Sequence, residues 1–151
     1  MDVSITNIGS TKAARIRHVG PYDQIGPCFE RLAQWAGSTG SPFTRVFMLS
    51  WDNPDFVAPE NLRSDACIAL ETDIQPPDGI VYEGIEGGRF AVFTYRGPYS
   101  GLRDVYMRMF SEWLPASGER MADRPCMEIY LNSPLEVAPE DLVTEVCIPV
   151  A

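Results

Sequence analysis

The sequence has few of the residues that build metal sites. Among its 151 residues there is one histidine, His18, and no two of the four cysteines form a Cys-x-x-Cys pair. Structural zinc sites need clustered cysteine and histidine ligands, so we expect no metal site. We interpret all four cysteines as buried, reduced thiols of a protein in a reducing compartment. They are Cys28, Cys67, Cys126 and Cys147.

Long apolar runs and cofactor signatures are also missing. The apolar stretches are far shorter than a membrane span, and the N-terminus has no basic segment followed by an apolar one. These absences predict a cytoplasmic protein with no membrane partner. The sequence has no phosphate-binding loop, no dinucleotide-binding glycine pattern and no Gly-x-Ser-x-Gly motif. We therefore expect no cofactor.

Positive charge is scarce relative to negative charge. The chain has 12 Lys and Arg residues against 21 Asp and Glu residues, which gives a formal net charge of -9 at pH 7. Phosphate groups would be repelled by this charge, so we expect no direct contact with nucleic acid. An acidic surface commonly serves solubility, and it also suits a cationic ligand.

What the sequence does contain is an internal repeat over nearly its whole length. A Gly-Pro-Tyr triplet opens a helix-like stretch twice, and the two stretches match up to a tryptophan and a glycine after a one-residue slip. A shared Val-Ala-Pro-Glu then fixes the register further along. The aligned positions are Gly20-Pro21-Tyr22 with Gly97-Pro98-Tyr99, Trp35 with Trp113, Gly40 with Gly118, Val57 with Val137, and Cys67 with Cys147.

Each half predicts the same order of elements. Residues 12–19 and 88–96 are rich in the β-branched and aromatic residues of strands, and Gly-Pro ends each of them. Apolar residues at helical spacing follow, and we expect Gly37 and Gly40 to end the first helix and Pro115 to end the second. Two closing strands complete each half, at residues 45–51 and 65–70 and at residues 126–132 and 144–150.

We therefore predict an α+β fold of two pseudo-symmetric strand–helix–strand–strand repeats within a single domain, 1–151. Repeat 1 covers about residues 1–74, residues 75–79 are a linker, and repeat 2 covers about residues 80–151. The leading strands should pair with the first strand of their own half, with a hairpin turn at residues 86–88. Each antiparallel sheet would carry a helix on one face, with a ligand cleft between the halves.

One charged residue distinguishes the third strands of the two copies. Side chains alternate between the faces of a strand, and we expect the more apolar set of each strand to lie under its helix. That arrangement turns Glu128 and Tyr130 toward the cleft, opposite Met48 and Ser50 of the first copy. The two apolar sets are Met127, Ile129 and Leu131, and Phe47, Leu49 and Trp51.

Glu128 is out of pattern because it is a carboxylate in the middle of an apolar strand. A buried carboxylate must be paired, hydrogen-bonded or protonated, and a cationic ligand would supply the missing charge. The alternative is an internal ion pair with Arg15 or Arg17, which we expect on the open face of their strand. Packing alone also explains Tyr130, whereas Trp51 lies at a strand end and suits either role.

With these features the chain resembles the GyrI-like domains. That family includes small bacterial DNA gyrase inhibitory proteins and the effector-binding domains of AraC-type and MerR-type multidrug regulators. The matching segments are "HVGPYDQI" with its helix to Trp35, "SWDNPDFVAPENLRSDACI" and "RPCMEIYLNSP". They cover almost the full length, and we expect the stand-alone form without a DNA-binding extension.

The resemblance implies a role for the strand glutamate. In that family a glutamate in this context contacts cationic, aromatic drugs in the cleft, and here the position is Glu128, with Tyr130 as its aromatic neighbour. We expect a protein that sequesters or senses amphipathic, cationic or aromatic small molecules. The candidate ligand-binding residues are Glu128, Tyr130, Met48, Ser50, Arg15, Arg17 and Trp51.

Two other functions stay open. The family also includes hydrolases of strained, cyclopropane-containing natural products that use a cleft glutamate and tyrosine. As an enzyme of that kind, this protein would use Glu128 as the general acid or base and Tyr130 to orient a water or the leaving group. The third function is inhibition or protection of DNA gyrase by protein–protein contact, with an acidic surface that mimics nucleic acid. We favour the binding protein over the enzyme.

Overall fold

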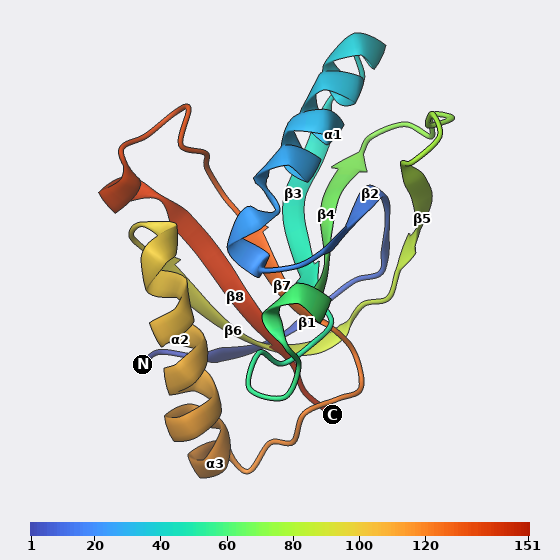
Figure 1. The fold of residues 1–151 in the computed structure, drawn as a ribbon. Helices are drawn as coiled ribbons and strands as arrows, with labels where there is room; N and C mark the ends of the chain where they lie inside the picture. Colours follow the sequence, from blue (N-terminus) through green and yellow to red (C-terminus); the bar gives the residue numbers. More distant parts are fainter. The chain divides into compact units, whose positions relative to one another are not determined.

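The computed structural model describes residues 1–151. The chain forms two compact units, one made of Met1–Ile8 with Gly88–Ala151 and the other of Gly9–Gly87 (Figure 1). Each unit contains antiparallel strands and a helical segment, so the predicted α+β class is confirmed. No helix has the length and apolar character that crossing a membrane requires.

The unit of Gly9–Gly87 has four strands in the order β3–β4–β2–β5, and α1 packs on β2 and β4. Leu32 and Ala36, two residues of the predicted apolar face of α1, are buried one turn apart. The elements are β2 (Thr11–Val19), η1 (Tyr22–Gln24), α1 (Gly26–Thr39), β3 (Phe43–Ser50), η2 (Pro59–Asn61), β4 (Arg63–Leu70) and β5 (Val81–Ile85).

The other unit has the strand order β1–β6–β8–β7, and its helical segment packs on β6 and β8. Leu102, Val105 and Met109 from the helix meet Val146 and Ile148 from the sheet in one buried apolar cluster. The elements are β1 (Ser4–Ile8), β6 (Gly88–Arg96), η3 (Tyr99–Gly101), α2 (Leu102–Arg108), η4 (Met109–Trp113), α3 (Leu114–Ser117), β7 (Cys126–Tyr130), η5 (Pro139–Asp141) and β8 (Val143–Pro149).

The leading strands are exchanged between the two repeats. β1 pairs with β6, and β5 pairs with β2, so the prediction that each pairs within its own half, through a hairpin at residues 86–88, is wrong. Just beyond the paired ends of β2 and β5, the Gly87 amide donates to the Ser10 hydroxyl at 3.0 Å. Because the repeats resemble one another, either leading strand suits either sheet, and alternation within a strand does not specify its partner.

The residues expected to link the repeats form an irregular connection. Residues 75–79 lie outside the strands, between β4 and β5. Since β5 joins the sheet of β2, this connection begins and ends within the unit of Gly9–Gly87.

A glycine turn carries the chain from sheet to helix in both units. Gly20 and Gly97 have φ angles of 137° and 149°, a region that residues with a Cβ rarely occupy. Their amides donate to the carbonyls of Leu62 and Leu142, each at 2.8 Å. The turn is therefore tied to the residue that precedes the closing strand of its own sheet.

A side chain reinforces each turn. His18 Nε2 lies 2.9 Å from the carbonyl oxygen of Pro21, and the Tyr95 hydroxyl donates to the carbonyl of Pro98 at 2.8 Å. His18 and Tyr95 are equivalent in the sequence repeat, so two different side chains make the same contact. A carbonyl only accepts, so this contact makes His18 a donor through Nε2.

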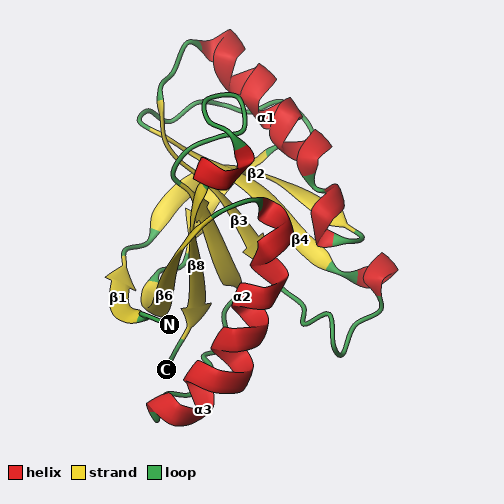
Figure 2. Ribbon diagram, turned by 90° about the vertical axis from the view of Figure 1, so that its left-hand side faces the viewer, coloured by secondary structure: helices red, strands yellow, loops and turns green.

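The second helix contains a π-helical turn, η4, between α2 and α3. One more residue separates Tyr99 from Gly118 than separates Tyr22 from Gly40, and both glycines end their helices in the left-handed conformation. A π turn accommodates one extra residue in a continuous helix. It therefore explains the one-residue slip in the repeat, and Figure 2 shows α2 and α3 in line.

Pro115 does not end the second helix as expected. The helix continues to Ser117, and Gly118 ends it. Pro115 lies in the first turn of α3, where a proline is tolerated because the π turn has already interrupted the regular ladder. The missing amide hydrogen therefore does not break the helix.

The four cysteines are free, as predicted. Cys67 and Cys147 are buried, whereas Cys28 and Cys126 are half-buried, which is less than we expected. Burial, together with the nearby negative charge of Glu128, raises the pKa of Cys126 to about 12. Cys126 therefore stays a neutral thiol at physiological pH.

Substitution of Gly101 tests the packing of the second turn. A Cβ added at Gly101 would lie 2.1 Å from the Tyr95 hydroxyl, although the backbone there is helical. We expect Gly101→Ala to lower the free energy of unfolding by about 1–3 kcal/mol. The loss should be smaller in a Tyr95→Phe background, as measured by urea denaturation of all four proteins. Equal losses in both backgrounds would contradict this packing.

Candidate ligand-binding site

Glu128 lies in the middle of β7 and is almost completely buried, with 6% of its surface exposed. Its Oε2 accepts a hydrogen bond from the Tyr106 hydroxyl at 2.8 Å, and its Oε1 accepts one from the Tyr130 hydroxyl at 3.1 Å. Both donors are neutral. The carboxylate thus has hydrogen-bond partners in its own unit but no basic side chain paired with it.

Glu128 faces the helix, not the side away from it as predicted. It lies directly opposite Val146 in the β7–β8 pairing, and Val146 belongs to the cluster under α2. Met127 and Ile129, expected under the helix, point to the other face and are buried as well. Because both faces of β7 are apolar and buried, the pattern of alternation gave no sound basis for choosing the helix side.

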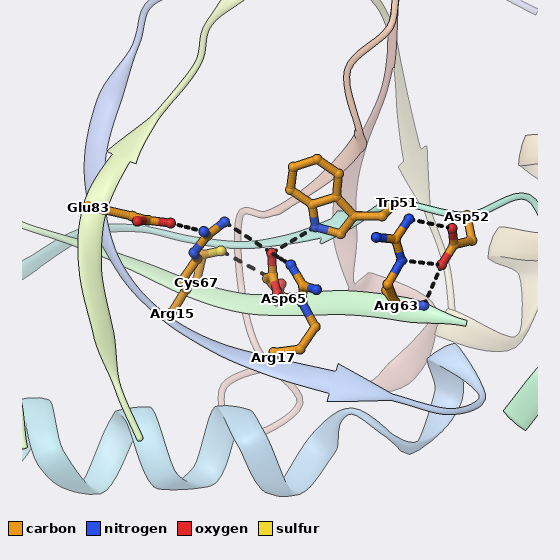
Figure 3. Close-up of polar contacts among 8 residues, drawn as sticks. All are labelled: Arg15, Arg17, Trp51, Asp52, Arg63, Asp65, Cys67 and Glu83. Atoms are coloured by element: carbon orange, nitrogen blue, oxygen red, sulfur yellow. Dashed lines mark hydrogen bonds and ion pairs between the residues drawn. The ribbon is translucent and has the colours of Figure 1, made fainter. Parts of the chain in front are cut away.

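The same inversion occurs in β3. Met48 pairs with Ala66, and Leu49 pairs with Asp65, so consecutive residues again divide between the faces. Figure 3 shows Asp65 and its partners on the side of the sheet away from α1. Met48, which is buried, and Ser50, which is half-buried, therefore lie on the α1 side, contrary to the prediction.

Burial dominates the electrostatics of Glu128. It raises the pKa of this carboxyl, while the hydrogen bonds from Tyr106 and Tyr130 act in the opposite direction and do not cancel the effect. Burial and the charge of Glu128 also raise the pKa of Tyr106 well above its ordinary value, so Tyr106 remains a donor. In this environment the Glu128 carboxyl is stabilised either by a proton or by a nearby positive charge.

Aromatic rings surround this carboxyl. Tyr99 meets Tyr130 edge to face, with 5.6 Å between ring centroids and 64° between the planes. Tyr106 stacks on Phe110 at 6.4 Å and 16°. We call Tyr99, Tyr106 and Tyr130 the tyrosine cluster.

Sequence reasoning missed Tyr99 and Tyr106. A signal for Tyr106 was present in the repeat, because its equivalent in the first copy is Phe29, just as Met48 is the equivalent of Glu128. Two apolar residues of the first copy are therefore replaced by a hydroxyl and a carboxylate that contact each other in the second. Comparing the copies over the helix as well as the strand would have revealed this pair.

The arginines considered as partners of Glu128 bind a different carboxylate. Arg15 Nη1 donates to Asp65 Oδ2 at 3.2 Å, and Arg17 Nε donates to Asp65 Oδ1 at 2.5 Å. Arg15 also forms an ion pair with Glu83. Figure 3 shows both arginines reaching Asp65 from β2, on the open face of the sheet where they were predicted.

Trp51 belongs to the same group. Its indole Nε1 donates to Asp65 Oδ2 at 2.8 Å, and the Arg17 guanidinium lies 5.7 Å from the centre of its rings. Asp65 is only 1% exposed, whereas Trp51 is 39% exposed. Arg15, Arg17 and Trp51, three of the candidate binding residues, thus surround a buried carboxylate of their own unit.

Neutralising Asp65 should destabilise the protein. Asp65→Asn keeps the shape but leaves Arg17 without its counter-charge and Arg15 with Glu83 as its remaining partner. We expect the free energy of unfolding to fall by about 2–4 kcal/mol, as measured by chemical denaturation. The matched control is Glu112→Gln, which removes an exposed pair with Arg108 and should cost less than about 0.5 kcal/mol. A loss as small as the control's would show that Asp65 does not hold the group together.

The raised pKa of Glu128 predicts a pH-dependent stability. Above pH 4.5, the ordinary value for this carboxyl, the unfolded chain releases a proton that the folded protein retains. The contribution of Glu128 to stability is therefore present at low pH and is lost as pH rises through the folded-state pKa. Wild type should lose stability relative to Glu128→Gln over this window, as measured by urea denaturation at a series of pH values. Parallel pH profiles for the two proteins would contradict this assignment.

No group of three or more His, Cys, Asp or Glu side chains is placed to hold a metal ion. At Glu128 the protein offers one carboxyl, and the tyrosine cluster offers hydroxyls and aromatic rings. Such a site can bind a cation by charge, stack an aromatic group, or move a proton through the carboxyl.

Comparison with known proteins identifies the family. The family described as "GyrI-like small molecule binding domain" matches residues 1–151. The chain belongs to the GyrI-like family. It is 34% identical over 137 residues to a "DNA gyrase inhibitor" of Edwardsiella piscicida, covering 87% of this chain and 88% of that protein. It is 31% identical over 157 aligned residues to the "Probable transcriptional regulator YgiV" of Escherichia coli K12, covering 100% of this chain and 97% of that one.

Solved structures share the GyrI-like fold. The C-terminal domain of EcmrR matches with a TM-score of 0.87 and 18% identity, over 99% of this chain and 97% of that one. The structure of SAV2435 bound to tetraphenylphosphonium matches with a TM-score of 0.63 and 13% identity, over 100% and 94% of the two chains. The chain is thus a GyrI-like small-molecule-binding domain, and its fold is that of the EcmrR C-terminal domain.

Proposed function

We propose that this protein binds cationic, aromatic small molecules and that Glu128 supplies the opposite charge. The observation that carries the proposal is a carboxylate 6% exposed whose partners are two tyrosine hydroxyls and no basic side chain. A protein that sequesters or senses such compounds needs a site of this kind.

The energetics favour a cation over an anion or a neutral polar ligand. An ionised carboxylate in an apolar environment loses its hydration, and neutral hydroxyls restore only part of what is lost. A positively charged ligand would complete the interaction, since charge-assisted contacts are stronger in such surroundings. Anions would be repelled by the same carboxylate.

The tyrosine cluster supports an aromatic ligand. Tyrosine rings offer apolar faces and edges for stacking, and they attract cations placed over their faces. A structural neighbour provides a probe, because SAV2435 is bound to tetraphenylphosphonium, a cation with four phenyl rings. We propose that this chain accepts ligands of the same chemical class.

The direct test is Glu128→Gln, which keeps the shape and removes the charge. We expect tetraphenylphosphonium to bind the variant about ten- to a hundredfold more weakly, as a lost charge-assisted contact implies. Triphenylphosphine oxide, which is neutral and carries three of the same rings, should bind both proteins alike. Isothermal titration calorimetry of both ligands with both proteins gives the four dissociation constants.

A matched control uses the other buried carboxylate. Asp65→Asn removes a charge that already has two arginine partners, so it should leave the preference for the cation unchanged in protein that remains folded. If Glu128→Gln weakens both ligands equally, or neither, then Glu128 does not provide the counter-charge and the proposal fails.

A hydrolase is the second candidate, favoured by the raised pKa of Glu128 beside the Tyr130 hydroxyl. A carboxyl of this kind suits a general acid for opening a strained ring, with Tyr130 orienting the water or the leaving group. Incubation with a cyclopropane-containing electrophile distinguishes the two functions. An enzyme would convert it catalytically and lose turnover in Glu128→Gln, whereas a binding protein would release it unchanged.

DNA gyrase is a further candidate partner. The observation behind it is a formal net charge of -9, which could mimic nucleic acid toward a DNA-binding enzyme. A relative named DNA gyrase inhibitor is 34% identical. A supercoiling assay with purified gyrase tests this activity separately from ligand binding.

A further inference from the structure

Tyr99 differs from the other two members of the tyrosine cluster. Tyr106 and Tyr130 both donate hydrogen bonds to Glu128, whereas the Tyr99 hydroxyl makes no hydrogen bond. Its side chain is 39% exposed, and its ring is held by the edge-to-face contact with Tyr130. Of the three rings, Tyr99 is held most weakly.

The equivalent residue of the first copy is fixed more firmly. The Tyr22 hydroxyl donates to the carbonyl of Asp52 and accepts from the Asp52 amide at 3.0 Å. The contacts to Tyr22 come from the main chain of Asp52. In the second copy, Asn132 takes the place of Asp52, but neither its amide nor its carbonyl hydrogen-bonds to the Tyr99 hydroxyl. The loop that anchors Tyr22 in one copy therefore leaves Tyr99 unanchored in the other.

The main chain at Tyr99 is nevertheless rigid. The Tyr95 hydroxyl binds the Pro98 carbonyl at 2.8 Å, and the Gly101 amide donates to the same carbonyl at 3.0 Å. These bonds fix the residues on both sides of Tyr99. Movement of the ring therefore requires rotation of its side chain and no rearrangement of the turn.

Tyr99 lies close to the charge of Glu128. Burial, and after it the negative charge of Glu128, raises the pKa of the Tyr99 hydroxyl. The ring thus lies against Tyr130, whose hydroxyl binds the carboxylate, and near the carboxylate itself. Glu128 is too deeply buried to meet a large cation unless a neighbouring side chain moves.

We propose that the Tyr99 ring occupies the position against Tyr130 that an aromatic ring of the ligand takes, so that ligand binding displaces it. Tyr99 is then an internal competitor and determines which ligands reach Glu128. A ligand with a ring of its own restores the contact that Tyr130 loses, and one without a ring does not. This inference rests on the proposed binding of cationic aromatics at Glu128.

The proposal makes an unusual prediction for Tyr99→Ala. Removing an aromatic side chain from an aromatic binding site should tighten binding, because the ligand no longer competes with Tyr99. We expect tetraphenylphosphonium to bind about three- to tenfold more tightly and to associate faster by a similar factor, as the loss of one aromatic pair implies. Tyr99→Phe should behave like wild type, since the hydroxyl has no hydrogen bond to lose.

Calorimetry gives the affinities and stopped-flow fluorescence gives the association rates. The control is Tyr82→Ala in the unit of Gly9–Gly87, which removes a tyrosine whose hydroxyl binds Asp73 and should leave both quantities unchanged. Weaker binding by Tyr99→Ala would mean that the ring is a wall of the ligand site, and an unchanged affinity would mean that the ring is not displaced. Either result overturns the proposal.

A second measurement does not require truncating the side chain. With 3-fluorotyrosine at position 99, saturation with tetraphenylphosphonium should move the fluorine resonance toward that of free fluorotyrosine. A resonance that does not move on binding also overturns the proposal. If tetraphenylphosphonium fails to bind wild type, or binds without dependence on Glu128, the proposed function itself fails.

Discussion

Both units depend on one hydrogen-bonded turn that fixes the start of the helix over the sheet. In the second copy, the Gly97 amide binds the Leu142 carbonyl and the Tyr95 hydroxyl binds the Pro98 carbonyl, each at 2.8 Å. These contacts position α2 relative to β7 and β8. The hydrogen bond between Tyr106 and Glu128 follows from that placement, because one residue lies on the helix and the other on the strand beneath it.

The π turn that accommodates the extra residue of the second helix lies beyond Tyr106, so it does not change the position of Tyr106 over the sheet. The π turn at Met109–Trp113 comes after Tyr106, so the stretch from Tyr99 to Tyr106 has the same length as that from Tyr22 to Phe29. The two copies therefore hold equivalent positions over their sheets up to the residue that binds Glu128. Beyond it, the π turn changes the helix, and Phe110 lies within that turn and stacks on Tyr106.

The sequence predicted the elements of the fold better than their partners. Strands, helices and the Gly-Pro turns follow from local patterns, and the repeat made those patterns more certain. The exchange of β1 and β5 did not follow, because two similar sheets accept either strand. The helix side of β7 was also assigned wrongly, since Met127 and Ile129 are as well buried as Glu128 and alternation alone does not say which face meets the helix.

The same rule that singled out Glu128 applies to a second residue, Asp65. Asp65 lies near the start of β4 and Glu128 in the middle of β7, and both are buried carboxylates on strands. The strands beside them decide the outcome: Asp65 has Arg17 directly opposite on β2, whereas Glu128 has Val146 opposite on β8. One carboxylate is neutralised within the fold, and the other has only hydroxyl partners. A chain that surrounds one buried carboxylate with arginines and leaves the other with tyrosines keeps a destabilising feature, and the proposed cationic ligand at Glu128 would give that feature a use.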